Sequence, residues 1–336
     1  MRAMVLAAGL GTRLRPITYA MPKPMVPVLN RPVMEHIVRL LVRNGFGEAI
    51  ANLHWFPETI EGHFGNGSGL GIELSYSREQ QLLGTSGGVR NAAGFLGDSF
   101  LVISGDALSD IDLAAMREFH ESHDGIATLA TKRVRDTTQF GVAITGVDGR
   151  IQGFQEKPQP AEALSDLANC GIYMFRAEIF DYFPEPGTSK AAGPDDPDGF
   201  ADWAMDVFPA LLENDVPFYS HEIEAYWNDI GNLDELRQGN LDALHGAVEI
   251  ESDVPQVADG IRSASPLEGV EIEGPALIGS GVSFGAGTRV QGPAIIGDGC
   301  EIGAGAWVRD SILLDGAELP AEGMLVGAIA GRVAEP

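Results

Sequence analysis

Cysteine is scarce in this chain of 336 residues, which holds only Cys170 and Cys300. Two cysteines so far apart form neither a disulfide framework nor the paired spacing of a zinc site. Long apolar runs are also missing, since no stretch is apolar over the roughly 20 residues that span a bilayer. Met1 and Arg2 lead straight into a predicted strand, without the small-residue cleavage site of a signal peptide. These absences predict a cytoplasmic protein that does not enter a membrane.

Positive charge is in short supply, with 22 basic residues against 48 acidic ones and a net charge of −26. A surface this acidic repels nucleic acid and anionic lipid, so neither is expected as a partner. Residues 1–43 are the exception, because they carry seven of the basic residues and a single acidic one, Glu35. Cations concentrated in one part of an acidic chain predict a binding site for a small anion there.

Lysine is the rarest charged residue, with four in the chain. Two of them, Lys23 and Lys157, are each followed by a proline, which stiffens the backbone next to the ammonium group. A compact ammonium in a rigid setting suits a point-charge contact to phosphate. Lys190 lies in a polar loop at residues 184–199 and is expected to be solvated. That loop is either a mobile lid or a solvated connection, and the sequence leaves both alternatives open.

Strand-like and helix-like runs alternate as far as residue 245, which predicts βαβ units. The expected strands are 3–8, 49–53, 100–104, 126–131 and 217–221, and the expected helices are 34–44, 58–64, 113–123 and 233–245. Three further strands, 140–145, 150–155 and 169–175, have no helices between them and predict an antiparallel insertion. The expected fold is therefore an α/β, doubly wound, Rossmann-like, mostly parallel mixed sheet in a domain of residues 1–245.

The C-terminal part has a six-residue period. The first register is Ile272, Ile278, Phe284, Val290, Ile296, Ile302, Val308 and Leu314, and a second register of small or branched residues runs from Val270 to Ile312. A third register contains Gly279, Gly285, Gly297 and Gly303, which we expect at corners with positive φ. This strict period predicts a left-handed parallel β-helix of hexapeptide repeats over residues 246–336.

Histidine is absent from the predicted β-helix, the last one in the chain being His245. Many hexapeptide β-helices belong to acyltransferases, which need a histidine as the base, so that activity is not expected here. The segment is predicted to be structural, either covering the first domain or joining subunits. Because a β-helix leaves flat faces and an open end exposed, a homo-oligomer is expected.

Three motifs are predicted to follow strands at the carboxyl edge of the sheet, where open α/β sheets bind ligands. The first, GLGTRLRP from Gly9, is neither a P-loop nor a dinucleotide turn, because Leu14 stands at the sixth position. The other two place Asp106 and Asp229 after predicted strands. A carboxylate in a phosphate site typically holds Mg²⁺, although either aspartate alone could be a turn residue.

Together these motifs resemble the sugar-1-phosphate nucleotidyltransferases, the sugar-nucleotide pyrophosphorylases. The shared segments are GLGTRLRPITYAMPKPMVPVLNRP, EQQLLGTSGGV, SGDALSDIDL, FGVAITG, FQEKP, NCGIYMF and YWNDIG, in the order of that family. The C-terminal repeats resemble the β-helix of several members. The resemblance implies transfer of a nucleotidyl group from a nucleoside triphosphate to a sugar-1-phosphate, with release of pyrophosphate and with Mg²⁺ as cofactor.

The resemblance also implies which residues form the site. The catalytic residues are Arg13, Lys23 and Lys157. Nucleotide binding falls to Leu6, Ala8, Gly9, Gly11, Thr12, Arg13, Lys23, Glu79, Gly84, Thr85 and Asp106. Sugar-phosphate binding falls to Gly141, Glu156, Lys157, Asn169 and Gly171, and metal binding to Asp106 and Asp229. Because both reactants are anions, the chemistry requires neutralised charge and alignment more than proton transfer.

The base of the nucleotide is predicted from Glu79. In the family that the chain resembles, members that transfer a thymidylyl or uridylyl group more often have a glutamine at this position. A carboxylate only accepts hydrogen bonds, and guanine offers two donors on its pairing edge. The sequences of these motifs resemble those of mannose-1-phosphate guanylyltransferases most. They differ at Gly87-Gly88, where that group usually has Gly-Ala. We therefore interpret the reaction as GTP and mannose-1-phosphate giving GDP-mannose. Glucose-1-phosphate thymidylyl- or uridylyltransferase remains the alternative, since Gln80 or Gln81 could donate to a pyrimidine carbonyl.

An alternative outside the enzymes is a non-catalytic regulatory paralogue. Such a protein would bind sugar nucleotide and a partner subunit. Such paralogues tend to lose a phosphate-binding cation or a metal-binding acid. This chain keeps Arg13, Lys23, Asp106, Lys157 and Asp229. The complete set favours an enzyme.

Overall fold

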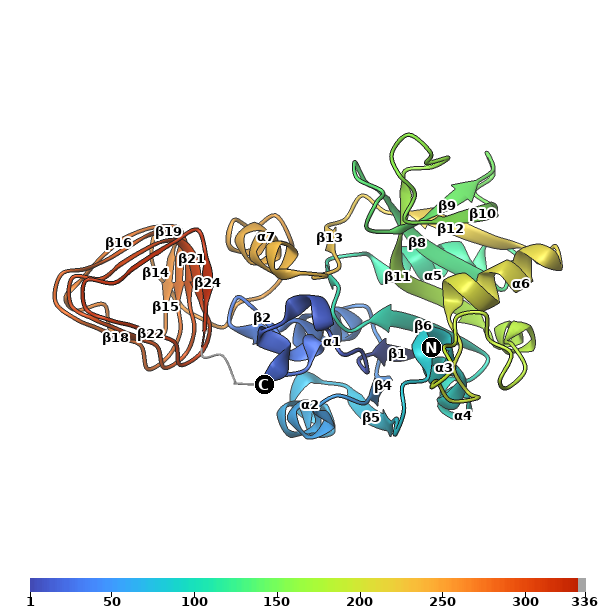
Figure 1. Ribbon diagram of the computed structural model, residues 1–336, viewed down its shortest axis with the longest axis horizontal. Helices are drawn as coiled ribbons and strands as arrows, with labels where there is room; N and C mark the ends of the chain where they lie inside the picture. The colour runs from blue at the N-terminus through green and yellow to red at the C-terminus, as the bar shows by residue number, and fades with distance from the viewer. Residues whose placement is uncertain (332–336) are drawn as a thin grey trace. The chain divides into compact units, whose positions relative to one another are not determined.

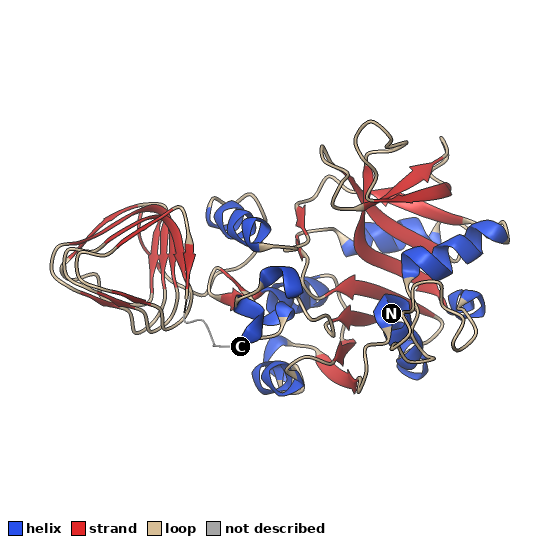
Figure 2. Ribbon diagram, viewed as in Figure 1, coloured by secondary structure: helices blue, strands red, loops and turns tan. Residues whose placement is uncertain are grey.

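The computed structural model describes residues 1–331 (Figures 1 and 2). Its internal contacts divide the chain into two compact units. The first, here called the sheet unit, comprises Met1–Leu10, Ile37–Ala107 and Ile111–Trp227. The second, the β-helix unit, comprises Gly11–His36, Leu108–Asp110 and the chain from Asn228 onward. These units group the chain by contacts and are not contiguous in sequence, so the predicted division at residue 245 stays a prediction.

The sheet unit is built on a nine-stranded mixed sheet with the order β10-β9-β11-β6-β1-β4-β5, and β8 and β12 continue it beside β11. Its strands are β1 (Arg2–Leu6), β4 (Glu48–Leu53), β5 (Glu73–Arg78), β6 (Ser99–Ser104), β8 (Ala127–Arg133), β9 (Gly141–Thr145), β10 (Ile151–Glu156), β11 (Leu167–Arg176) and β12 (Phe218–Glu222). β1 pairs in parallel with β4 and β6, and β4 with β5. β11 runs antiparallel to β6 and β8, and β9 to β10. The predicted doubly wound mixed sheet and its antiparallel insertion are confirmed.

The predicted helices are present as α1 (Val33–Arg43), α2 (Pro57–Phe64), α5 (Leu113–Glu121) and α7 (Leu233–Leu244). Strand β5 and four helical segments were not predicted, namely α3 (Gly84–Asn91), α4 (Ala93–Leu96), a π-helix at Trp203–Val207 and α6 (Phe208–Glu213). Among the described residues, no helix combines the length and the apolar character needed to cross a membrane.

Aromatic side chains fill the core of the sheet unit. Phe100 of β6 and Phe175 of β11 pack together, and Phe175 stacks on Trp203 with ring centroids 4.5 Å apart. Phe208 stacks on Trp203 and on Phe218 of β12. Because β6 and β11 are locked into this cluster, the residues at their ends are held by a rigid scaffold.

The C-terminal part of the β-helix unit stacks short strands into rungs (Figure 1). The strands pair in parallel, except that the first, Gln256–Ala258, pairs antiparallel with the second. They are β14 (Gln256–Ala258), β15 (Ile261–Ser263), β16 (Val270–Glu273), β17 (Ala276–Ile278), β18 (Ser283–Phe284), β19 (Thr288–Ile296), β20 (Glu301–Ile302), β21 (Trp307–Leu313), β22 (Glu318–Leu319), β23 (Met324–Val326) and β24 (Ile329–Ala330). Val270 pairs with Thr288 and Ala276 with Ala294, three hexads further on. The predicted hexapeptide β-helix is confirmed.

The predicted period slips by one residue within β21. Ile296 pairs with Leu313 and not with Leu314, so Leu313 is the buried residue that continues the apolar ladder. The register shifts between Gln291 and Ala294 because the following coil turns this corner with one residue fewer, through Asp310 at φ 49°. The prediction for Leu314 was therefore wrong. The same holds for Ile312 in the second register, because Ser311 is the residue that pairs with Ala294.

The predicted role of the repeat glycines was also wrong. Positive φ occurs at Gly281, Gly287, Gly299 and Gly305, and not at the four glycines of the predicted register. Those four permit close stacking of successive coils instead. A Cβ on Gly285, for example, would lie 2.2 Å from the backbone nitrogen of Ala304 in the next coil.

Candidate active site

The carboxyl ends of β1 and β6 lie side by side in the sheet unit. Leu6 pairs with Ser104, and the backbone N–H of Gly105 donates to the carbonyl of Leu6 at 2.9 Å. A Cβ on Gly105 would lie 2.9 Å from that same carbonyl oxygen, so only glycine fits between the two strand ends. Asp106 therefore follows β6 directly beside the point where the glycine turn leaves β1, as the sequence predicts.

The glycine turn continues in the β-helix unit as residues 11–23, here called the phosphate segment. It contains two short 3-10 turns, at Thr12–Leu14 and Ile17–Tyr19, and a third turn, Lys23–Met25, begins at its last residue. Gly11 has φ +61°, and its carbonyl accepts from the hydroxyl of Thr18 at 2.8 Å. A Cβ on Gly11 would lie 2.8 Å from the Cβ of Lys23, so the glycine lets the lysine pack against the turn. Thr12 and Arg13 are exposed.

The segment around Asp229 lies against the same cations in the β-helix unit. The ammonium of Lys23 donates to the backbone carbonyl of Asp229 at 3.3 Å. A Cβ on Gly231 would lie 3.1 Å from Nη1 of Arg13 and 3.0 and 3.1 Å from the two carboxylate oxygens of Asp229. The fold thus brings together two predicted phosphate cations and one predicted metal ligand that is 206 residues from Lys23 in the sequence.

A cavity of about 590 Å³ in the sheet unit gathers four of the five predicted sugar-phosphate residues. They are Gly141, Glu156, Lys157 and Asn169, and side chains including Phe154 and Met205 complete the wall. Its size lies within the usual range of small-molecule pockets. Gly141 and Glu156 pair across β9 and β10, and a Cβ on Gly141 would lie 2.9 Å from Oε2 of Glu156. Glycine at this position makes room for the carboxylate.

The polar side chains of this cavity form hydrogen bonds and an ion pair within the chain, and those of Glu156 and Lys157 are also exposed to solvent. Nζ of Lys157 lies 3.0 Å from Oε1 of Glu156, and both side chains are about half exposed. Asn169 donates to the hydroxyl of Tyr173 at 2.9 Å and accepts from the N–H of Gly171 at 3.1 Å. Gly171 does not line the cavity. It has φ +70° and packs on β6, where a Cβ would lie 2.6 Å from the Oγ of Ser104.

Glu79 is nearly buried and already accepts two hydrogen bonds from the chain. Its Oε1 accepts from Nδ2 of Asn52 at 2.8 Å, and its Oε2 accepts from the N–H of Leu83 at 3.1 Å. Burial raises the pKa of the Glu79 carboxyl, and these two hydrogen bonds oppose the rise. A guanine base would therefore have to use the remaining lone pairs of an anchored carboxylate.

Asn52 is a residue that the sequence analysis missed. It lies one residue before the end of β4, between the apolar residues Ala51 and Leu53. It is buried, and its Oδ1 accepts from the N–H of Ala7 at 2.9 Å. Asn52 and Glu79 together link the exit of β1 to the start of α3. A Cβ on Gly88 would lie 2.7 Å from both Asn52 Nδ2 and Glu79 Oε1, which explains the glycine where the resembled group usually has alanine. An asparagine inside the apolar stretch 49–53 was the available signal.

The start of α3, with Gly84 and Thr85, is covered by residues of the sheet unit. A Cβ on Gly84 would lie 2.4 Å from the carbonyl oxygen of Ala201, and that oxygen accepts from the N–H groups of Ser86 and Gly87. The hydroxyl of Thr85 donates to Asp202 at 2.8 Å. The Thr85 hydroxyl is therefore engaged within the chain before any nucleoside binds.

The loop at residues 184–199 is anchored at both ends and in its middle. Arg90 donates to the carbonyls of Pro184 and Gly199, each at 2.9 Å. The buried carboxylate of Asp206 accepts from the hydroxyl of Ser189 and from the N–H of Lys190, each at 2.7 Å. These hydrogen bonds tie the loop to α3 and to the π-helix.

Asp106 in the sheet unit and Asp229 in the β-helix unit each carry carboxylate oxygens, the kind of ligand that Mg²⁺ prefers. In the part of the chain that the structure describes, no group of three or more His, Cys, Asp or Glu side chains is arranged to hold a metal. Mg²⁺ usually binds through one or two carboxylates together with water and substrate phosphates. Magnesium binding by these two aspartates stays a prediction.

Asn52→Ala is expected to lower the free energy of unfolding by about 1–3 kcal/mol, because it leaves the buried N–H of Ala7 and one Glu79 oxygen without their partner. Urea denaturation followed by circular dichroism measures this. The matched control is Asn91→Ala, which removes an exposed hydrogen bond to Ser77 and is expected to stay within about 0.5 kcal/mol of the wild type. Equal effects of the two variants would contradict the structural role of Asn52.

Comparison with known proteins shows which families and solved structures the chain is similar to. Residues 2–246 match the nucleotidyl transferase family, and residues 275–310 match bacterial transferase hexapeptide repeats. A UTP–glucose-1-phosphate uridylyltransferase of Synechocystis sp. is 37% identical over 83% of this chain and 74% of its own length. A mannose-1-phosphate guanylyltransferase of Mycobacterium tuberculosis is 33% identical over 85% of this chain and 77% of its own. The crystal structure of a putative glucose-1-phosphate thymidylyltransferase from Bacillus anthracis has a TM-score of 0.63 at 25% identity, covering 75% of this chain and 98% of that one.

Proposed function

The chain belongs to the nucleotidyl transferase family, and we propose that it uses Mg²⁺ to transfer a nucleotidyl group from a nucleoside triphosphate to a sugar-1-phosphate. The similar proteins are sugar-1-phosphate nucleotidyltransferases, and this chain is an enzyme of that class. The observation that carries the proposal is the cavity that places Glu156, Lys157 and Asn169 around one space of hexose-phosphate size. The expected cytoplasmic location and self-association stay predictions.

In the proposed reaction, an oxygen of the sugar-1-phosphate attacks the α-phosphate of the triphosphate. A new P–O bond forms to the sugar phosphate, and the bond to pyrophosphate breaks. Lys157 neutralises the attacking phosphate, Lys23 the α-phosphate, and Arg13 the charge that develops on the departing pyrophosphate. Mg²⁺, when bound, supplies further positive charge at the phosphates. Glu156 and Asn169 orient the sugar by hydrogen bonds to its hydroxyl groups.

For the substrate pair, we propose GTP and mannose-1-phosphate. Support comes from the acceptor-only carboxylate of Glu79 and from the similarity to a mannose-1-phosphate guanylyltransferase. UTP and glucose-1-phosphate form a second candidate pair. Two observations favour it: the 37% identity to a uridylyltransferase and the engagement of both Glu79 oxygens by the chain itself.

A pyrophosphate-release assay with Mg²⁺ tests the proposal by crossing GTP, UTP, dTTP and ATP with mannose-1-phosphate and glucose-1-phosphate. The highest kcat/KM is expected for GTP with mannose-1-phosphate. A preference for UTP or dTTP with glucose-1-phosphate would keep the reaction and overturn the proposed base and sugar. Folded protein that releases no pyrophosphate with any pair would instead indicate the regulatory paralogue.

A further inference from the structure

A β-hairpin follows the phosphate segment directly in the β-helix unit. It consists of β2 (Pro27–Val28) and β3 (Arg31–Pro32), and the two turn residues, Leu29 and Asn30, both have positive φ, 49° and 60°. The N–H of Val33 donates to the carbonyl of Val26 at 3.0 Å and closes the base of the hairpin. Only a few residues separate Lys23 from this base, so any displacement of the hairpin is transmitted to the lysine.

Helix α7 holds one edge of the hairpin through a single buried side chain. Oδ1 of Asn240 accepts from the N–H of Leu29 at 2.9 Å, and its Nδ2 donates to the carbonyl of Pro27 at 3.0 Å. Asn240 is 1% exposed. Its amide pairs with a donor and an acceptor of the hairpin backbone much as a neighbouring strand would.

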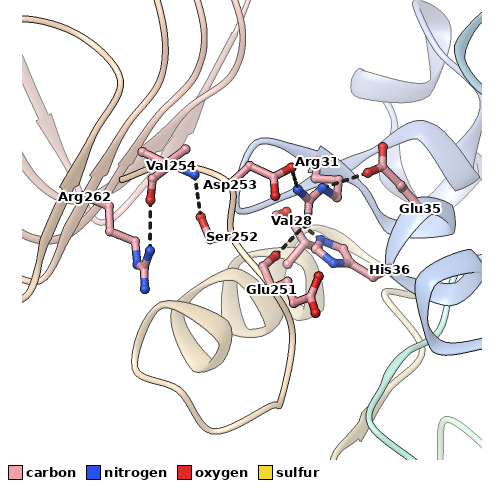
Figure 3. A network of polar contacts seen from close by, with 9 residues as sticks. All are labelled: Val28, Arg31, Glu35, His36, Glu251, Ser252, Asp253, Val254 and Arg262. Atoms are coloured by element: carbon pink, nitrogen blue, oxygen red, sulfur yellow. Dashed lines mark hydrogen bonds and ion pairs between the residues drawn. The ribbon is translucent and has the colours of Figure 1, made fainter. Parts of the chain in front are cut away.

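The segment that leads into the β-helix holds the other edge through Arg31, whose side chain is 10% exposed (Figure 3). Nε of Arg31 lies 2.9 Å from Oε1 of Glu35, and Nη1 donates to the carbonyl of Glu251 at 2.6 Å. Nη2 forms an ion pair with the carboxylate of Asp253. At the turn, Asn30 donates to the carbonyl of Ile296 in β19 at 2.8 Å.

We propose that the hairpin at residues 27–32 is a clasp through which the C-terminal part of the chain positions the phosphate segment, with Arg31 as the positioning residue. Three separate C-terminal elements grip it: α7, residues 251–253 and strand β19. The β-helix is then more than a cover, because its attachment sets how well residues 11–23 are ordered before a nucleotide binds. The consequence for nucleotide affinity rests on the proposed function.

Asp253 is the position at which the clasp can be loosened with least disturbance. Its side chain is 73% exposed, so Asp253→Asn removes the charge that pairs with Arg31 while keeping the size of the side chain. The matched control is Asp310→Asn. Asp310 pairs with Arg237 at 2.5 Å, and this ion pair joins α7 to β21 instead of to the hairpin. Asp310 has φ 49°, a conformation that asparagine tolerates.

Hydrogen–deuterium exchange tests the clasp without any assay of activity. In Asp253→Asn, peptides covering residues 11–26 are expected to exchange roughly tenfold faster than in the wild type, because local opening becomes easier. The amides to follow include those of Leu14 and Val26, which donate to Gly11 and Lys23. In Asp310→Asn the rates of these peptides should not change. Wild-type rates in Asp253→Asn, or an equal increase in the control, would overturn the proposal.

The KM values for the two substrates of the wild type's preferred pair provide a second readout. A general loss of stability would not raise one KM without the other. Asp253→Asn is expected to raise KM for the nucleoside triphosphate roughly three- to tenfold while KM for the sugar phosphate stays within about twofold. Equal increases in both constants would contradict a role at the phosphate segment. If the wild type releases no pyrophosphate with any pair, the proposed function fails, and the exchange experiment still decides for or against the clasp.

Discussion

Lys157→Ala is expected to lose roughly 10²- to 10³-fold in kcat/KM for the sugar phosphate, the magnitude typical of removing one group that stabilises developing charge. Lys157 contributes its ammonium to a cavity shared with Gly141, Glu156 and Asn169. Without it, Glu156 leaves an uncompensated negative charge beside an incoming phosphate, so binding and alignment both suffer. Pyrophosphate release at varied sugar-phosphate concentration measures the loss.

Lys190→Ala is the matched control, because it removes a lysine whose ammonium lies 3.6 Å from Glu213 with both side chains about two-thirds exposed. Its kcat/KM is expected within about twofold of the wild type, since exposed ion pairs contribute little to stability. Lys157→Ala should likewise keep its thermal midpoint, because the pair it breaks with Glu156 is also exposed. Near-native turnover in Lys157→Ala would refute the assignment of the cavity to the sugar phosphate.

The main strands of the sheet could be predicted because short runs of consecutive apolar residues indicate buried strands. Runs such as 49–51 and 100–103 are apolar on both faces, as buried strands of such sheets are. Helix α3 was not predictable in the same way. It begins with Gly84-Thr85-Ser86-Gly87-Gly88, residues of low helix propensity. Its first turn depends on the carbonyl of Ala201, more than a hundred residues away, and no local pattern reveals such a partner.

In the candidate site, too, some features could be predicted from neighbouring residues, whereas others depend on contacts between residues far apart in the sequence. The glycine turn and Lys157-Pro158 could be read from neighbouring residues alone. The pairing of Glu79 with Asn52 could not, because it depends on how the ends of β4 and β5 meet in the sheet. Sequence reasoning treated Glu79 as a free acceptor for a base, whereas the fold already uses both of its oxygens.

Asp106→Asn is expected to lower kcat at least about a hundredfold at ordinary Mg²⁺ concentrations, since a metal ion at a phosphoryl group contributes several kcal/mol of charge stabilisation. The substitution keeps the size of the side chain at the end of β6 and removes its charge. The apparent affinity for Mg²⁺ should fall as well, so raising Mg²⁺ is expected to restore part of the lost rate. Chelation of divalent ions should abolish pyrophosphate release by the wild type.

Asp98→Asn provides the control from the opposite end of the same strand. Asp98 is exposed and immediately precedes β6, and its backbone carbonyl, which the substitution keeps, accepts from the N–H of Ala177. Turnover and Mg²⁺ dependence of Asp98→Asn should match the wild type. An aspartate flanks β6 at each end, Asp98 before it and Asp106 after it. Only the end of the strand at Asp106 adjoins the glycine turn that leaves β1. If Asp106→Asn kept both the turnover and the Mg²⁺ dependence of the wild type, Asp106 would be a turn residue and the metal would have to bind elsewhere.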